Sequence, residues 1–140
     1  MADRTLTGGC LCGAVRYTSN KPVHDVKHCH CSMCRKAHGA LFVSFGIVPS
    51  DGFAFVKGEA NLGDYESSPG SHRLFCRTCG GQVINRVDKW PDQVFVALGS
   101  LDAGQTPGHA QGHERHIFWE SRVGWYETGD DLPKDTEYGD

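Results

Sequence analysis

Seven cysteines in three short groups constrain the fold of this 140-residue chain more than any other feature of its sequence. Cysteines this close together in a sequence can form disulfides, bind a metal ion or supply a catalytic thiol. The groups are Cys10 with Cys12, Cys29 with Cys31 and Cys34, and Cys76 with Cys79. Any fold for this chain must explain why these groups, far apart in the sequence, each occupy so few residues.

The cellular compartment separates disulfides from metal sites. The N-terminal sequence MADRTLTGG lacks the apolar core of a signal peptide. No stretch approaches the roughly 18 apolar residues of a membrane helix. We therefore expect a cytoplasmic protein. The cytoplasm is reducing, and clustered cysteines there more often bind a metal or act in catalysis than form disulfides. The odd number of cysteines also disfavours a disulfide framework. A net charge of -3 gives no general attraction to nucleic acid or to a membrane surface.

The rest of the sequence predicts an all-β fold with at most short helices. Its 18 glycines and 6 prolines leave few windows long enough for a helix. Short apolar, β-branched and aromatic runs separated by turn signals are typical of strands. These runs cover 14–18, 40–48, 53–58, 72–76, 82–87, 93–101 and 116–121. One short helix is expected from Ser32 to His38, with Ser32 as its N-cap. We expect one domain over 1–140, in which about 126–140 form a loose acidic tail.

The cysteine spacing divides naturally into four ligands and three. Cys76-x-x-Cys79 runs into Gly80, which tolerates the positive φ that such a metal-binding turn often requires. A structural zinc takes four ligands in a tetrahedron. The pairs Cys10/Cys12 and Cys76/Cys79 would supply them and clip distant parts of the chain together. The triplet Cys29, Cys31 and Cys34 would then keep an open fourth position, as catalytic zinc sites do.

Several alternatives to two zinc sites remain open. There could be one site plus free thiols, or His28 or His30 could close the triplet as a fourth ligand. An extended chain would instead point these histidines away from Cys29 and Cys31. The spacing does not match common iron–sulfur patterns, and no base is singled out for a catalytic thiol. Arg35 and Lys36 would offset thiolate charge and could hold an anionic ligand, or could simply be exposed helix residues.

The chain resembles the glutathione-dependent formaldehyde-activating family, which also includes the centromere protein V group. The resemblance covers nearly the whole chain. It rests on GGCLCGAVRY at 8–17, HCHCSMCRK at 28–36 with Gly39 and Ala40 after it, and FCRTCG at 75–80. The stretches GSLD at 99–102 and HIFWESRVGW at 116–125 also match the family's ending.

The resemblance implies a β-tent fold of small antiparallel sheets that holds two zinc ions. The family's structural zinc ligands match Cys10, Cys12, Cys76 and Cys79. Its second, activity-associated zinc matches Cys29, Cys31 and Cys34. The implied reaction is the reversible condensation of formaldehyde with glutathione, a carbon–sulfur lyase activity. Arg35, Lys36, His116 and Trp125 are candidate substrate-binding residues, although Trp119 and Trp125 could be core aromatics and His116 a structural histidine.

Three functions fit these features. The first is a zinc-dependent carbon–sulfur lyase that acts on a small thiol adduct, such as a glutathione–aldehyde hemithioacetal. The second is a zinc-stabilised module that binds a protein partner, since no Lys/Arg-rich stretch suits nucleic acid. The third is a sensor whose triplet loses zinc on oxidation. The exposed edges of a short β domain could also pair in a homodimer.

Overall fold

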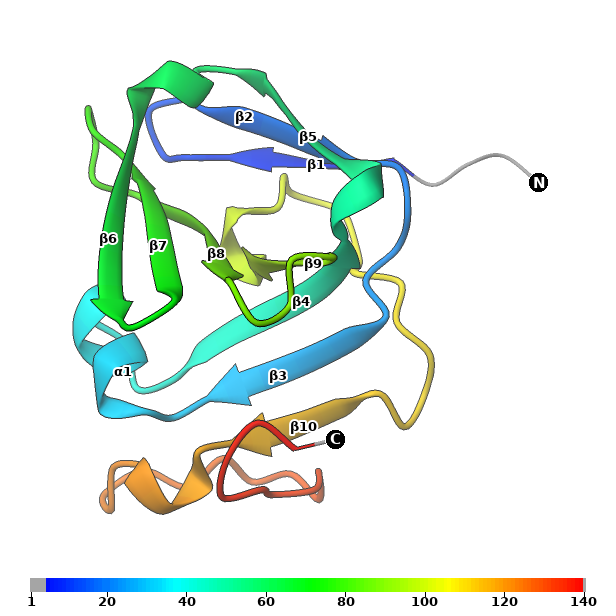
Figure 1. Ribbon diagram of the computed structural model, residues 1–140. Coiled ribbons are helices and arrows are strands. Elements are labelled where there is room, and N and C mark those ends of the chain that lie inside the picture. The colour runs from blue at the N-terminus through cyan, green and yellow to red at the C-terminus, as the bar shows by residue number, and fades with distance from the viewer. Residues whose placement is uncertain (1–4, 140) are drawn as a thin grey trace.

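The computed structural model describes residues 5–139 and is built mainly from strands (Figure 1). The single α-helix of the described residues, α1, spans Ser32–His38. The strands are β1 (Leu6–Gly9), β2 (Arg16–Ser19), β3 (Asp25–Cys29), β4 (Val43–Pro49), β5 (Phe53–Lys57), β6 (Leu62–Ser68), β7 (Ser71–Cys76), β8 (Gln82–Val87), β9 (Gln93–Ala97) and β10 (Glu114–Ile117). Four short 3-10 helices occupy Ser50–Gly52, Glu59–Asn61, Leu98–Ser100 and Trp119–Ser121. The expected all-β class is confirmed.

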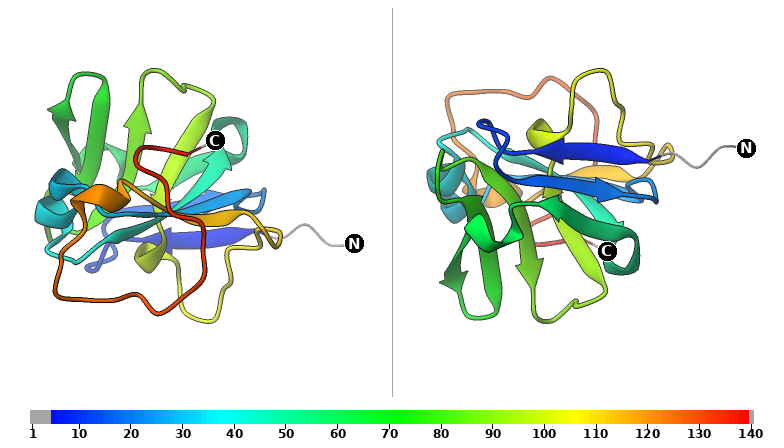
Figure 2. Two further views of the ribbon diagram at one scale, coloured as in Figure 1. Left: turned by 90° about the horizontal axis from the view of Figure 1, so that it is seen from below. Right: turned by 90° about the horizontal axis from the view of Figure 1, so that it is seen from above.

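The strands form two sheets. The smaller has the order β1-β2-β5, and the larger has the order β10-β3-β4-β9-β8-β7-β6. All pairs are antiparallel except β10 with β3, which run parallel and place Ile117 beside Cys29. The small sheet and the chain that follows β10 lie on opposite sides of the molecule (Figures 1 and 2). Among the described strands, this parallel pair departs from the small antiparallel sheets that were expected.

The central strands of the larger sheet are buried on both faces. Along β9, Val94 and Val96 join one apolar cluster, whereas Phe95 and Ala97 join another. Side chains alternate along a strand, so the two clusters lie on opposite faces of the sheet. Cys10 and Cys76 belong to the first cluster, and Cys29 and Cys34 to the second. The sheet therefore separates the two groups of cysteines.

All seven predicted runs overlap a strand, but three strands carry too weak a signal to be recognised in the sequence. β1 contains two glycines, β3 mixes two charged residues and one histidine with two apolar residues, and β6 is mostly polar. Sheet pairing overrides such weak propensities. The predicted helix has the expected bounds, but its N-cap was wrong. Cys31, not Ser32, holds the extended N-cap conformation, and its sulfur accepts from the Cys34 amide at 3.2 Å.

The C-terminal segment packs along β10 instead of forming the loose tail that was expected (Figure 1). The amide of His116 donates to the Pro133 carbonyl, and the Asp135 amide donates back to the His116 carbonyl. Arg115 pairs with the Asp135 carboxylate at 2.6 Å. The ring of Tyr138 packs against Trp90. These contacts cover the outer edge of β10, because its free backbone groups need partners.

Replacing Asp130 tests how strongly this segment is held. His116 is 1% exposed, and its Nε2 lies 2.9 Å from an Asp130 carboxylate oxygen. Asp130→Ala leaves this buried nitrogen without its partner, which costs about 1–3 kcal/mol. We expect urea unfolding to show that loss for Asp130→Ala, and almost none for the exposed neighbour in Asp131→Ala. Equal stability of both variants would contradict the docked segment.

Candidate metal centres

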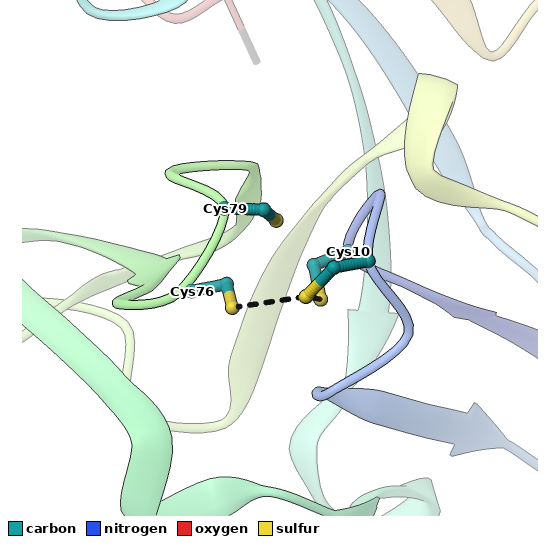
Figure 3. Close-up of side chains that lie close together, drawn as sticks. Cys10, Cys76 and Cys79 are labelled. Carbon is teal, nitrogen blue, oxygen red and sulfur yellow. Dashed lines mark hydrogen bonds between the residues drawn. The ribbon is translucent and has the colours of Figure 1, made fainter.

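Two turns bring together the four cysteines predicted to form a closed site. Cys10 and Cys12 lie in the turn after β1, Cys76 ends β7, and Cys79 lies in the turn before β8. The sulfurs of all four lie within 4.8 Å of one another. Figure 3 shows Cys76 and Cys79 from one turn facing Cys10 from the other. The predicted grouping of these cysteines agrees with the structure.

The distances between these sulfurs fit tetrahedral coordination of one metal ion. The Sγ of Cys12 lies 3.7 Å from that of Cys10 and 3.8 Å from that of Cys76. Four sulfurs at about 2.3 Å from a zinc ion would stand about 3.8 Å apart at tetrahedral angles. A disulfide needs about 2.05 Å, and all seven cysteines are free. The four-cysteine cluster is thus shaped to hold a metal ion.

Backbone amides stabilise the thiolate form of this cluster. The Val15 amide donates to the sulfur of Cys10 at 3.3 Å, and the Thr78 amide donates to that of Cys76 at 3.3 Å. Hydrogen bonds from the amides of Cys12 and Gly81 lower the pKa of Cys79 to about 6. Gly80 has φ 76°, the positive value expected for the turn after Cys79. Metal ligation requires deprotonated sulfur, which these amides favour.

The triplet forms a second cluster on the other face of the main sheet. Cys29 ends β3, Cys31 caps α1 and Cys34 lies in its first turn, and their three sulfurs lie within 4.8 Å of one another. Hydrogen bonds from the thiols of Cys29 and Cys34 lower the pKa of Cys31. A small cavity of about 90 Å³ borders all three cysteines. This cavity leaves room beside the sulfurs for a further ligand.

The histidines next to these cysteines point away from the sulfurs. His28 contacts Ser44 and Glu114 at 2.8 and 2.7 Å. The Nε2 of His30 lies 2.8 Å from Nδ1 of His116, and burial lowers the pKa of His30 to about 4. In the described part of the chain, neither histidine joins the metal-ligating group of the triplet. This arrangement agrees with the alternation argument, because ring nitrogens of both histidines contact other side chains.

Arg73 contacts the triplet, although nothing in the sequence pattern singled it out. It is 6% exposed, and its Nη2 donates to the Cys34 sulfur at 3.4 Å. No ion pair in the described residues gives Arg73 a carboxylate partner. A buried guanidinium needs a compensating charge, and a divalent ion on three thiolates would carry a formal charge of -1. Arg73 therefore supports an ionised, metal-loaded triplet.

The predicted substrate-binding residues lie in different places. Lys36 lines a groove beside α1. The side chain of Arg35 instead donates to the carbonyls of His30 and Ser121 and holds the helix against the C-terminal region. His116 is buried between His30 and Asp130. Trp125 is 75% exposed. The structure gathers only Lys36 of these four beside a cavity that adjoins the triplet.

Two aromatic residues border the triplet from distant parts of the chain. Phe118 follows β10, and Tyr138 lies in the C-terminal segment; both line the small cavity. Their rings pack edge to face at 4.9 Å. No sequence motif pointed to Tyr138, because its position depends on how the C-terminal segment folds back. It supplies one wall of the site.

His72 belongs to an exposed acidic group on the hairpin of β6 and β7. The hydrogen bond with Asp64 and the charge of Asp88 raise the pKa of His72. A histidine whose pKa is higher in the folded state than in the unfolded state stabilises the fold while it is protonated. This contribution is complete below the pKa of the unfolded state, about 6.5, and is lost as the pH rises through the pKa of the folded state. We therefore expect His72→Gln to lower Tm at about pH 6 and to match the wild type at about pH 8.5. NMR titration of the imidazole in Asp64→Asn should give a lower pKa than in the wild type; an unchanged value would contradict this assignment.

The sequence pattern of the family described as "Glutathione-dependent formaldehyde-activating enzyme" matches residues 5–121. This span includes all seven cysteines and Arg73. The chain belongs to this family. The resemblance inferred from the cysteine motifs is thus confirmed.

Family relatives share moderate identity with the chain. A "Putative glutathione-dependent formaldehyde-activating enzyme" of Halomonas elongata is 28% identical over 131 residues, covering 87% of this chain and 80% of its own. A protein of the same name from Sordaria macrospora is 30% identical over 100 residues, which are 69% of this chain. The match spans only 41% of that relative's length.

A solved structure has the same fold. The crystal structure of a Rhodobacter sphaeroides protein superposes with a TM-score of 0.57 at 27% identity. The superposition covers 72% of this chain and 91% of the other. In the described part of this chain, no helix combines the length and the apolar character needed to cross a membrane.

Proposed function

We propose that this protein is a cytoplasmic zinc-dependent carbon–sulfur lyase that acts on the hemithioacetal of formaldehyde and a glutathione-like thiol. The family membership supports this activity. The observation that carries the proposal is a cluster of three sulfurs that borders a cavity and that, among the described residues, groups with no histidine. Three protein ligands with room for a fourth are the arrangement of catalytic zinc. The four-cysteine cluster would hold a structural zinc, so the chain would bind two ions.

The reaction forms or breaks one C–S bond. In the condensing direction, the thiolate sulfur attacks the carbonyl carbon of formaldehyde, and the oxygen gains a proton to become a hydroxyl group. In reverse, the hydroxyl loses this proton, the C=O bond reforms and the thiolate leaves. A bound zinc ion would supply a Lewis acid for the oxygen or the sulfur.

Residues of this chain prepare the site for that chemistry. Cys29, Cys31 and Cys34 would hold the ion at the end of β3 and the start of α1. Arg73 would stabilise negative charge beside Cys34, because its Nη2 already contacts that sulfur. Phe45, Phe95 and Phe118 limit water around the sulfurs. A dry site strengthens such electrostatic contacts.

Exchange NMR tests the proposed activity. The enzyme should accelerate exchange between free glutathione and S-hydroxymethylglutathione above the uncatalysed rate, which is measured in the same buffer without protein. The assay uses protein purified without chelator, whose zinc content per chain has been measured. Exchange at the uncatalysed rate by protein that carries two zinc ions would contradict the proposed function.

A further inference from the structure

The C-terminal segment borders the triplet from a part of the sequence that the family pattern does not cover. That pattern ends at residue 121. Tyr138 nevertheless lines the small cavity beside Cys29, Cys31 and Cys34. The end of the chain, red in Figure 1, folds back along β10 to bring Tyr138 there. Any role of Tyr138 at the triplet is therefore specific to this chain and not a property of the matched pattern.

Tyr138 separates the small cavity from a second one on the same face of the main sheet. The small cavity has a volume of about 90 Å³ and the second about 200 Å³. Both lie over the apolar cluster that contains Phe45, Ile47 and Phe95. Among the described residues, Phe95 and Tyr138 line both spaces. Because Phe95 is part of β9, the ring of Tyr138 is the part of this partition that lies outside the sheet.

Contacts on two sides hold Tyr138 in this position. Its ring packs edge to face against Trp90 at 5.1 Å and against Phe118 at 4.9 Å. Its backbone carbonyl accepts from Lys27 Nζ at 2.7 Å. The carbonyl of the preceding residue, Glu137, accepts from the Phe118 amide at 3.1 Å. Edge-to-face packing is a favoured aromatic geometry, so these contacts fix the ring as a wall between the two cavities.

The volume of the small cavity limits what can lie beside the sulfurs. One water molecule occupies about 30 Å³ in the liquid, so a cavity of about 90 Å³ has room for only a few heavy atoms. A benzene ring needs a cavity of about 150 Å³. A group of one or two carbons fits beside the triplet, whereas an aromatic ring does not. Without the Tyr138 ring, the space would join the second cavity of about 200 Å³ and would accept such a ring.

We propose that Tyr138 is a specificity-determining residue that restricts the aldehyde handled at the triplet to one or two carbons. The inference rests on the proposed function, because the carbonyl carbon of the adduct would lie beside the three sulfurs. The Tyr138 ring excludes larger aldehydes because it occupies the space into which their chains would extend. This selection acts on the aldehyde part of the adduct and leaves the thiol part unaffected.

Exchange NMR with two adducts tests this selection. The adducts are the hemithioacetals of glutathione with formaldehyde and with phenylacetaldehyde. The wild type should prefer the formaldehyde adduct in kcat/KM by at least about tenfold. Tyr138→Ala should lower this preference at least about tenfold, and Tyr138→Phe, whose ring fills the same space, should keep it. A merely structural role would slow both reactions alike, so an unchanged preference in Tyr138→Ala would overturn the proposal.

Tyr126→Ala is the matched control. Tyr126 lies in the same C-terminal segment, is 48% exposed and lines neither cavity. Tyr138 is itself 36% exposed, so both variants should fold, which circular dichroism verifies. The preference between the two adducts should be unchanged in Tyr126→Ala. A change as large as that in Tyr138→Ala would show that general loosening of the segment causes the effect, and would overturn the proposal.

Alkylation of the triplet tests the cavity wall without catalysis. Iodoacetamide is small, N-phenylmaleimide carries an aromatic ring, and both react with cysteine thiolates. Peptide mass spectrometry measures the rates at Cys29, Cys31 and Cys34 in the protein as purified with its metal. Tyr138→Ala should accelerate modification by N-phenylmaleimide at least about tenfold more than modification by iodoacetamide. Equal rate changes for the two reagents would show that Tyr138 does not limit the size of the cavity.

The proposed lyase function and this inference fail in different ways. If the wild type catalyses exchange but its preference does not depend on Tyr138, the lyase function stands and the specificity assignment is wrong. If neither the wild type nor any variant catalyses exchange, the lyase function and the aldehyde specificity are both wrong. The alkylation rates then decide whether Tyr138 forms a wall of the triplet cavity. Zinc content measured on the same samples excludes metal loss as the cause.

Discussion

Cys76→Ser is expected to lose most of the stability of the folded state. Cys76 is 0% exposed, and its sulfur lies 3.8 Å from that of Cys12, 64 residues away in the sequence. Structural zinc contributes apparent binding free energies of about 10–16 kcal/mol in small metal-binding modules. A typical domain has a free energy of unfolding of about 5–15 kcal/mol. Weakening metal binding at the four-cysteine cluster should therefore remove a large share of the free energy of unfolding.

Thermal unfolding followed by circular dichroism measures this loss. Each kcal/mol shifts Tm by about 3–5 °C at this chain length, so a drop of at least roughly 15 °C is expected for Cys76→Ser. The turn after β1 should then detach from the turn between β7 and β8. Addition of a strong chelator to the wild type should reproduce the effect. A variant with wild-type Tm and one fewer zinc ion would show that this cluster does not hold the fold together.

Cys31→Ser is expected to abolish catalysis and leave the fold intact. The Cys31 sulfur caps α1 by accepting from the Cys34 amide at 3.2 Å. A serine hydroxyl is a preferred N-cap and can replace this contact. Serine is a poor zinc ligand by comparison, so the metal at the triplet should be lost. We expect the rate of exchange to fall by more than about 100-fold. Replacing a residue that only hydrogen-bonds to a metal ligand lowers activity by about 10- to 100-fold, so loss of the ligand itself should cost more.

The matched variant Cys31→Ala separates metal loss from cap loss. It should be as inactive as Cys31→Ser, but should lose a further 1 kcal/mol or so of stability, because alanine cannot cap the helix. Zinc analysis should give about one ion per chain for both variants, since the four-cysteine centre is untouched. Full exchange activity in folded Cys31→Ser would contradict a catalytic role for the triplet.

The sequence by itself determined the fold class and the division of the cysteines into a group of four and a group of three. Short β-branched and aromatic runs between glycine turns can form little except strands. Cysteines two or three residues apart can face one ion from a single turn, so each local group was evident without coordinates. Alternation in an extended chain was also sufficient to place His28 and His30 away from the sulfurs.

Other features depend on contacts between residues far apart in the chain, and only the tertiary structure decided them. Arg73 reaches Cys34 because β7 crosses beside α1, 39 residues away in sequence. Tyr138 borders the triplet because the C-terminal segment folds back along β10. The two cysteine clusters lie on opposite faces of one sheet because neighbouring residues on β9 point alternately into the two apolar clusters that contain them. Local spacing identifies the ligands of a site, whereas the residues that surround them are set by strand pairing and packing across the whole chain.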